Sequence, residues 1–180
     1  MSRLRAAPWP VLLKIVSLVS TLVLGGAAYV LHRTIPYGTQ APFAETFGTW
    51  IALVPPLILV GSALFIVTGY EVATEGLGIG RLLWTTHCDW LGLEAAWHDP
   101  AAMKGSLRIW GNGGLYSVTG FYRNRALGSY RAFVTDPKRA VVLRFTNRTL
   151  VVSPADPDAF LRQLALVRPE VRIGDPRASA

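Results

Sequence analysis

Two long hydrophobic segments near the N-terminus constrain this chain more than any other feature. Residues 10–31 contain one charged side chain, Lys14, and residues 49–70 contain none. At about 1.5 Å per residue the first segment would reach roughly 33 Å as a helix, enough to cross a hydrocarbon core of about 30 Å. Both segments are therefore predicted to be transmembrane helices. Trp50 and Tyr70, at the ends of the second, are expected at the two membrane interfaces.

The first segment has a second interpretation, because the basic residues of "MSRLR" precede it as they would in a signal peptide. Its apolar run is longer than the usual hydrophobic region of about 7–15 residues, which favours a retained helix. Retention and cleavage are both compatible with the sequence. Either outcome leaves the C-terminal part of the chain on the same side of the membrane.

The second segment contains Pro55 and Pro56 in its interior. A proline inside a helix removes a backbone donor and clashes with the preceding turn, so a kink is predicted here. The alternative is a hinge or a notch at which another helix packs.

The basic residues near the segment ends predict the orientation. Arg3, Arg5 and Lys14 flank the first segment, whereas the connecting loop 32–48 carries only Arg33, with Glu45 as a counter-charge. Positive flanks remain in the cytoplasm. The N-terminus and residues 71–180 are therefore expected in the cytoplasm, and the loop outside.

Composition supports a membrane anchor attached to a modest globular domain. Hydrophobic residues make up 51% of the 180 residues and charged residues 16%, below the usual quarter. The anchor is predicted over residues 1–70, the globular domain over 71–168 and a flexible tail over 169–180. The single cysteine, Cys88, excludes an intrachain disulfide.

The globular part alternates in hydrophobicity as short strands do, and about seven are expected. "AVVLRF" and "TLVVS" would form a tight hairpin through Asn147 and Arg148. The end of the domain differs, because Asp156 followed by Pro157 is a helix start signal. The helix is predicted to end before Pro169.

The same region resembles the bacterial PH-domain (pleckstrin-homology-like) family in its small membrane-anchored form. The resemblance covers about residues 70–166 and rests on a glycine-rich strand, a "TGFYRNRALGSYRAFVTD" stretch and a "VVSPADPDAF" helix entry. The matching positions are Gly113, Gly114, Gly120, Phe121, Leu127, Gly128, Tyr130, Thr135, Ser153, Pro154, Asp156, Pro157 and Phe160.

The resemblance implies a membrane-anchored α+β protein in which two transmembrane helices precede a PH-like antiparallel β-barrel or sandwich of about seven strands. One C-terminal α-helix would cap that barrel. It also implies a multi-pass protein of the bacterial inner membrane and no enzymatic activity.

The motifs for chemistry are weak. The glycines of "GNGG" lack the third glycine of a dinucleotide fingerprint, which would fall at Tyr116, and the lysine of a P-loop, so they are interpreted as bends or bulges of a sheet. His87, Cys88 and Asp89 are metal-ligand types, but neighbours on a strand point to opposite faces. No catalytic residue, metal site or cofactor is predicted.

Charge gives one candidate binding surface. Residues 101–150 contain nine basic residues and one acid, and basic side chains near an anionic leaflet each contribute about 1 kcal/mol of attraction. The candidate patch, facing the membrane or a partner, consists of Lys104, Arg108, Arg123, Arg125, Arg131, Lys138 and Arg139. Ordinary solvated strand faces are the alternative, and no nucleic-acid motif accompanies the charge.

The sequence therefore indicates a cytoplasmic binding or scaffolding domain at the inner leaflet that docks a protein partner or anionic lipid. The alternative is an accessory or regulatory subunit of a larger membrane transporter or envelope complex, with the helices as the working interface. Small residues would then form the helix-packing surface. They are Gly25, Gly26, Ala27, Gly61, Ser62 and Ala63.

Overall fold

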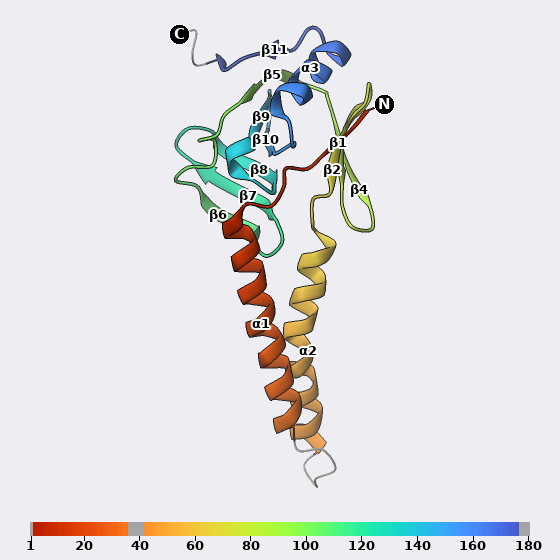
Figure 1. Ribbon diagram of the computed structural model, residues 1–180, viewed down its shortest axis with the longest axis vertical. Helices are drawn as coiled ribbons and strands as arrows, with labels where there is room; N and C mark the ends of the chain where they lie inside the picture. The colour runs from red at the N-terminus through yellow and green to blue at the C-terminus, as the bar shows by residue number, and fades with distance from the viewer. Residues whose placement is uncertain (1, 36–41, 177–180) are drawn as a thin grey trace.

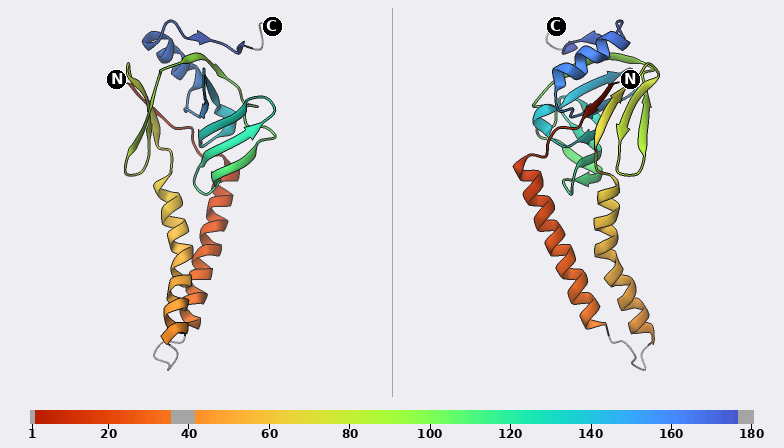
Figure 2. Two further views of the ribbon diagram at one scale, coloured as in Figure 1. Left: turned by 180° about the vertical axis from the view of Figure 1, so that it is seen from behind. Right: turned by 45° about the vertical axis from the view of Figure 1, so that its right-hand side comes forward.

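The molecule consists of a helical hairpin with a β-rich domain at one end (Figure 1). The computed structural model describes residues 2–35 and 42–176. Helices α1 (Val11–Thr34) and α2 (Pro42–Leu64) run side by side and join the domain at the same end (Figures 1 and 2). Val11–Thr34 and Glu45–Leu64 are long and apolar enough to cross a membrane.

The second predicted span is wrong at its C-terminal end. Helix α2 begins before residue 49 and ends at Leu64, and the chain then enters strand β2 (Gly69–Val72). Tyr70 is 1% exposed in the domain core and does not mark a membrane interface. The apolar residues from 65 onward therefore belong to the domain. The predicted span included them because a buried strand and a membrane helix are equally hydrophobic.

Pro55 and Pro56 lie inside α2, and the helix continues through both. Pro55 is buried although most of the helix surface is exposed. The predicted kink stays a prediction, and the burial of Pro55 favours the packing alternative.

The domain is a sandwich of two sheets. The smaller sheet has the order β1–β2–β3–β4, and all of its pairs are antiparallel. Its members besides β2 are β1 (Ser2–Arg5), β3 (Gly76–Gly80) and β4 (Thr85–Asp89).

The larger sheet has the order β11–β5–β9–β10–β8–β7–β6. Its strands are β5 (Leu93–His98), β6 (Leu107–Gly113), β7 (Val118–Asn124), β8 (Gly128–Val134), β9 (Val141–Phe145), β10 (Thr149–Val152) and β11 (Arg172–Ile173). Two pairs, β10–β8 and β11–β5, are parallel, so the pairing is not antiparallel throughout as expected. The predicted β9–β10 hairpin is confirmed, and Phe145 N–H donates to Arg148 O at 2.8 Å.

Helix α3 (Pro157–Val167) covers one end of the sandwich. Its predicted start is confirmed, because the Asp156 side chain accepts a hydrogen bond from Ala159 N at 2.9 Å. Phe160 and Leu164 are fully buried, and the Phe160 ring meets Tyr70 edge-on at 6.3 Å. The fold class inferred from the sequence is therefore confirmed: two apolar helices, a β-sandwich and a C-terminal helix.

Two strands lie outside the predicted domain boundaries. Strand β1 pairs with β2, so the residues before the first helix are part of the domain and not only of the anchor. Ala7 is 2% exposed; its N–H donates to Ser153 O at 2.8 Å and its carbonyl accepts from Thr135 Oγ1 at 2.7 Å. Strand β11 lies in the predicted flexible tail and pairs with β5; residues 177–180 of that tail lie outside the described residues.

Candidate functional site

The glycine stretch forms the β6–β7 hairpin, as the sheet interpretation expected. Gly111 and Gly120 pair directly, with φ values of 117° and 141°. A Cβ on Gly120 would collide with Trp110 O and lie 2.8 Å from Gly111 Cα. The two glycines therefore permit a close backbone approach, and the strand register shifts nearby, between Arg108 and Trp110.

Strand β4 separates the three metal-ligand types as expected from alternation. Cys88 points into the core and is 8% exposed, whereas His87 and Asp89 are exposed on the other face. Asp89 pairs with Arg148 at 3.1 Å. Within residues 2–35 and 42–176, no cluster of three or more His, Cys, Asp or Glu side chains is placed to hold a metal ion.

The fold divides the candidate basic patch between two sheet faces and several turns. Arg123 pairs with Ser129 and Phe121 pairs with Arg131, so both arginines lie on one face of β7–β8. Arg108 pairs with Tyr122 and therefore lies on the opposite face. A single continuous patch is thus not formed by the strand register.

The other four members lie outside the strands. Lys104 is in the turn before β6, Arg125 is in the β7–β8 turn, and Lys138 with Arg139 is in the short helix η1 (Pro137–Arg139). Arg139 lies 4.0 Å from the Asp136 carboxylate and donates to Ala155 O. The Arg139 guanidinium therefore already has partners within the domain.

Arg81, which is not a member of the predicted basic patch, extends the face of Arg123 and Arg131. The guanidinium carbons of Arg81 and Arg131 lie 5.0 and 4.8 Å from the centroid of the same Phe133 ring. In the described part of the chain neither arginine forms an ion pair with a carboxylate. Burial, and then the charge of Arg131, lower the pKa of Arg81 to about 10.

Arg81 also ties the domain to helix α2. It is 7% exposed, and its Nη1 donates to Phe65 O at 2.5 Å, directly after the helix end. Ser117 Oγ donates to the same oxygen at 3.2 Å. An arginine alone among apolar residues, as in "GIGRLLW", is a sequence signal that could have revealed this position.

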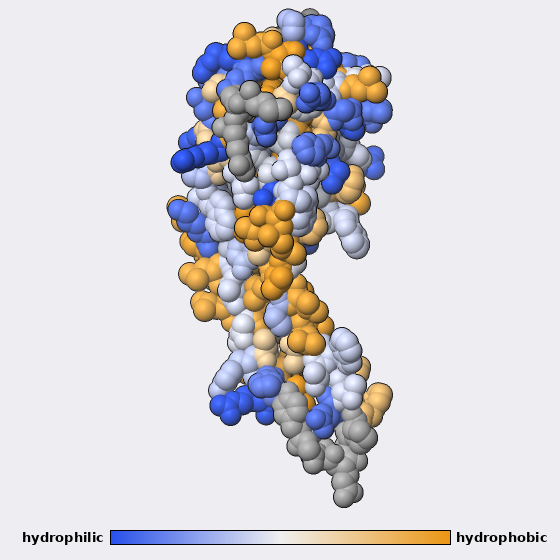
Figure 3. Space-filling model, turned by 90° about the vertical axis from the view of Figure 1, so that its right-hand side faces the viewer, coloured by the Kyte–Doolittle hydropathy of each residue, from blue (hydrophilic) through white to orange (hydrophobic). Residues whose placement is uncertain are grey.

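Hydrophobic side chains are exposed on the domain near the helices. Leu82 and Leu83 in the β3–β4 turn are 54% and 74% exposed, and Trp84 meets Phe65 edge-on at 5.3 Å. Trp110, on β6, is 76% exposed. Figure 3 shows hydrophobic surface along the helices that continues onto the base of the domain. The β3–β4 turn therefore lies at the level where α2 ends.

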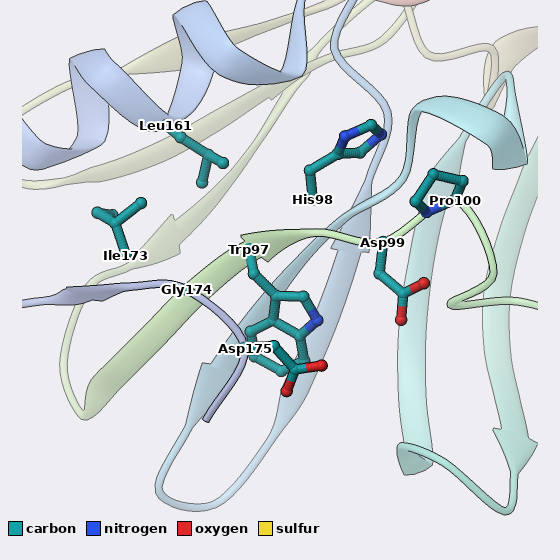
Figure 4. A pocket seen from close by; sticks show the side chains of 8 residues that line it. All are labelled: Trp97, His98, Asp99, Pro100, Leu161, Ile173, Gly174 and Asp175. Atoms are coloured by element: carbon teal, nitrogen blue, oxygen red, sulfur yellow. The ribbon is translucent and has the colours of Figure 1, made fainter. Parts of the chain in front are cut away.

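A pocket lies at the opposite end of the domain, between α3, β5 and β11 (Figure 4). Its volume is about 550 Å³. Leu161 and Ile173 form an apolar wall, and the Asp99 and Asp175 carboxylates lie near the Trp97 indole. This pocket could not be predicted from the sequence, because the residues of β11 were expected to belong to the flexible tail.

Comparison with known proteins gives one result for this architecture. A model of a bacterial PH domain family matches residues 69–167, more than half of the chain. The match covers strands β2 to β10 and helix α3, and it excludes β1, both long helices and β11. No match was found among curated proteins or among solved structures.

Proposed function

The chain belongs to the bacterial PH domain family, and from that premise we propose that it is a membrane-anchored docking protein without enzymatic activity. Two membrane-spanning helices hold the PH-like domain at the inner leaflet of the bacterial cell membrane. The anionic leaflet orients the domain, and the end remote from the helices binds a protein partner.

The observation that carries this proposal is the joining of both ends of the helical hairpin in one domain. Strand β1 precedes α1 and pairs with β2, which follows α2. Thr135, far along the chain, donates to Ala7 O. A chain that crosses a membrane twice returns to its starting side, and the antiparallel β1–β2 pair, which joins residues before α1 to residues after α2, requires that return. The basic flank of the first helix supports the cytoplasm as that side.

Arg123 and Arg131 support an orienting contact with lipid. They share one sheet face with Phe121, which is 50% exposed and lies 5.5 Å from the Arg131 guanidinium carbon. Aromatic and cationic side chains together suit the headgroup region of an anionic bilayer. The two charges supply on the order of 2 kcal/mol, which is an orienting contribution and not an anchor.

The pocket of Figure 4 supports partner binding at the free end. Its apolar wall is open to solvent, since Ile173 is 43% exposed, and two carboxylates lie beside it. A solvent-exposed apolar wall suits a peptide segment that carries an aliphatic anchor.

The experiment is copurification of the full chain in mild detergent, followed by mass spectrometry. Ile173→Glu changes the pocket wall, and Leu166→Glu on α3, where Leu166 is 83% exposed, is the matched control. We expect one stoichiometric partner with the wild type and with Leu166→Glu, and its loss with Ile173→Glu. The same recovery from all three proteins would exclude the pocket, and the absence of any partner would exclude the docking role.

The lipid contact has its own test in nanodiscs that hold the full chain. Hydrogen exchange at β7–β8 should slow when anionic lipid replaces zwitterionic lipid. Arg123→Ser should remove most of that change, whereas Arg125→Ser in the adjacent turn should retain it. An equal response of both variants would contradict an oriented contact.

The second candidate, an accessory subunit of a larger membrane complex, has one observation in its favour. A Cβ added at Gly25, Gly26 or Gly61 would meet nothing within 4 Å, so α1–α2 packing does not use these glycines. They would be available to a further helix. Loss of a copurifying membrane protein in Gly26→Leu, with retention in Ile173→Glu, would favour this candidate over the docking role.

A further inference from the structure

We propose that the tip of the β6–β7 hairpin, residues 113–117, is a third membrane-embedded element, inserted into the lipid leaflet beside α1. The proposal rests on the proposed spanning of α1. It concerns a segment outside both helices and outside every predicted span.

The tip lies along the side of α1 and not beyond its end. Tyr116 N–H donates to Ser17 Oγ at 2.9 Å, and Ser17 Oγ donates to Gly114 O at 3.4 Å. The Tyr116 hydroxyl and Thr21 Oγ1 are 2.9 Å apart. Helix α1 begins at Val11, so Thr21 lies about 15 Å along its axis. The hairpin therefore reaches past nearly three turns of the helix.

The length of α1 places these contacts within the membrane. If the bilayer began only beyond Thr21, residues 22–34 would supply about 20 Å, well short of a hydrocarbon core of about 30 Å. Helix α2 gives the same boundary, because its apolar span Glu45–Leu64 needs its full length to cross. Ser17 and Thr21 therefore lie below the surface of the leaflet, and the tip lies with them.

Lipid requires that irregular backbone has hydrogen-bond partners within the protein, and the backbone groups of Gly114 and Leu115 and the Tyr116 N–H have them. Asn112 Oδ1 accepts from Leu115 N at 3.0 Å and from Gly114 N at 3.3 Å, and its Nδ2 donates to Leu115 O. Ser17 is only 4% exposed; its hydroxyl donates to Gly114 O and accepts from Tyr116 N. Buried Ser17 and the side chain of Asn112 thus replace the water that an exposed turn would use.

The shape of the tip is held by α1 and by the segment before it. Tyr116 has φ 67°, a conformation that costs an ordinary side chain roughly 1–2 kcal/mol. Its ring stacks on Trp9 at 6.1 Å while its hydroxyl meets Thr21. These contacts fix the hairpin at one height on the helix.

The hydrophobic surface near the tip indicates that the lipid bilayer is what contacts the tip. Exposed Trp84 meets Phe65 at the end of α2, and the exposed Leu82 and Leu83 precede it in the same turn. This surface is continuous with the proposed spans, as Figure 3 shows for the base of the domain. The domain is thus seated in the leaflet by two turns, the β6–β7 tip and the β3–β4 turn.

Spin-label accessibility in the full chain, reconstituted in vesicles, tests the depth of the tip. Labels are placed singly at Leu115→Cys, at Val23→Cys on the exposed lipid side of α1, and at Leu166→Cys on α3, with Cys88→Ala as background. The label at 115 should resemble the one at 23: accessible to oxygen, which dissolves in lipid, and several-fold less accessible than the label at 166 to a water-soluble nickel chelate.

The outcomes separate this inference from the proposed spans. A label at 115 as accessible to nickel as that at 166, with 23 still in lipid, would overturn the insertion and leave the spans intact. Access of nickel to 23 would overturn the spans. Shielding of 115 from both reagents would indicate a covering protein chain and would also overturn the inference. Leu83→Cys, whose parent side chain is 74% exposed, gives an independent second site with the same expected result.

Discussion

Tyr70 shows how one buried side chain joins distant parts of the domain. Its hydroxyl donates to Phe133 O at 2.6 Å and accepts from Ser153 N at 3.0 Å. Burial raises the pKa of Tyr70 to about 12, partly offset by the hydrogen bond from Ser153. The neutral phenol is therefore favoured in the folded state.

This pKa predicts a loss of stability at high pH. A folded pKa above the unfolded value of about 10 stabilises the fold below pH 10, and the contribution disappears as pH rises towards 12. The loss should reach roughly 2–3 kcal/mol in the free energy of unfolding. Tyr70→Phe should lose about 1 kcal/mol at pH 7 but show a flatter profile above pH 10. Denaturant unfolding of both proteins in detergent measures this.

Arg81 titrates in the same range with the opposite sign, because its folded pKa is lowered to about 10. It is present in both proteins, and the Tyr70 charge is a smaller influence on the pKa of Arg81 than burial and Arg131, so the difference between the two profiles reports mainly Tyr70. Parallel profiles above pH 10 would show that Tyr70 does not carry the alkaline sensitivity.

Substitutions at Gly120 and Gly128 can distinguish the cost of backbone strain from the cost of a steric clash with a neighbouring strand. Both have positive φ, 141° and 71°, but a Cβ on Gly128 would meet nothing within 4 Å. Gly128→Ala should cost about 1 kcal/mol of stability from strain alone. Gly120→Ala should cost clearly more, because its methyl group collides with Trp110 O and crowds Gly111. Equal midpoints in thermal unfolding would refute the close approach.

The sequence could predict these glycines as sheet bends, because no phosphate motif was complete and the flanking residues favour strands. It could not predict that Arg123 and Arg131 would share one face of the sheet while Arg108 lies on the opposite face. That outcome depends on the strand register, which includes a shift between Arg108 and Trp110. Arg81 joins them through packing against Phe133, a contact that has no local sequence pattern.

At the level of elements, the junction between α2 and the domain rests on Arg81. Its hydrogen bond to Phe65 O is charge-assisted, and its guanidinium also lies 5.6 Å from the Phe65 ring centroid. Removing a charged hydrogen-bond partner from a buried site costs about 1.5–3 kcal/mol. Arg81→Ala should lower the thermal unfolding midpoint in detergent. Arg123→Ala, at an exposed position, is the control, and an equal effect of both would contradict a role for Arg81 at the junction.

The elements recognised from sequence were those with strong local signals. Helix α3 has its Asp156 cap and following proline, and the β9–β10 hairpin has alternating strands around a tight turn. Strands β1 and β11 have only four and two residues, and each exists because a distant strand pairs with it. The end of α2 was misplaced because hydrophobicity does not distinguish a span from the buried strand that follows it.

At the level of the whole molecule, the β1–β2 pairing links the membrane topology to the fold. The domain includes residues on both sides of the hairpin, so α1 is a structural part of the protein and not a removable leader in the proposed arrangement. The β6–β7 tip then adds a contact between the domain and the leaflet that no periodicity in the sequence predicts.

The central claim is that both long helices cross the membrane, with the domain on the cytoplasmic side. Cysteine labelling of intact spheroplasts with a membrane-impermeant maleimide tests it most directly, using Arg33→Cys at the end of α1 and Leu166→Cys on α3 in the Cys88→Ala background. We expect labelling at 33 in intact spheroplasts, and labelling at 166 only after the membrane is permeabilised. Labelling at 166 before permeabilisation would contradict the account.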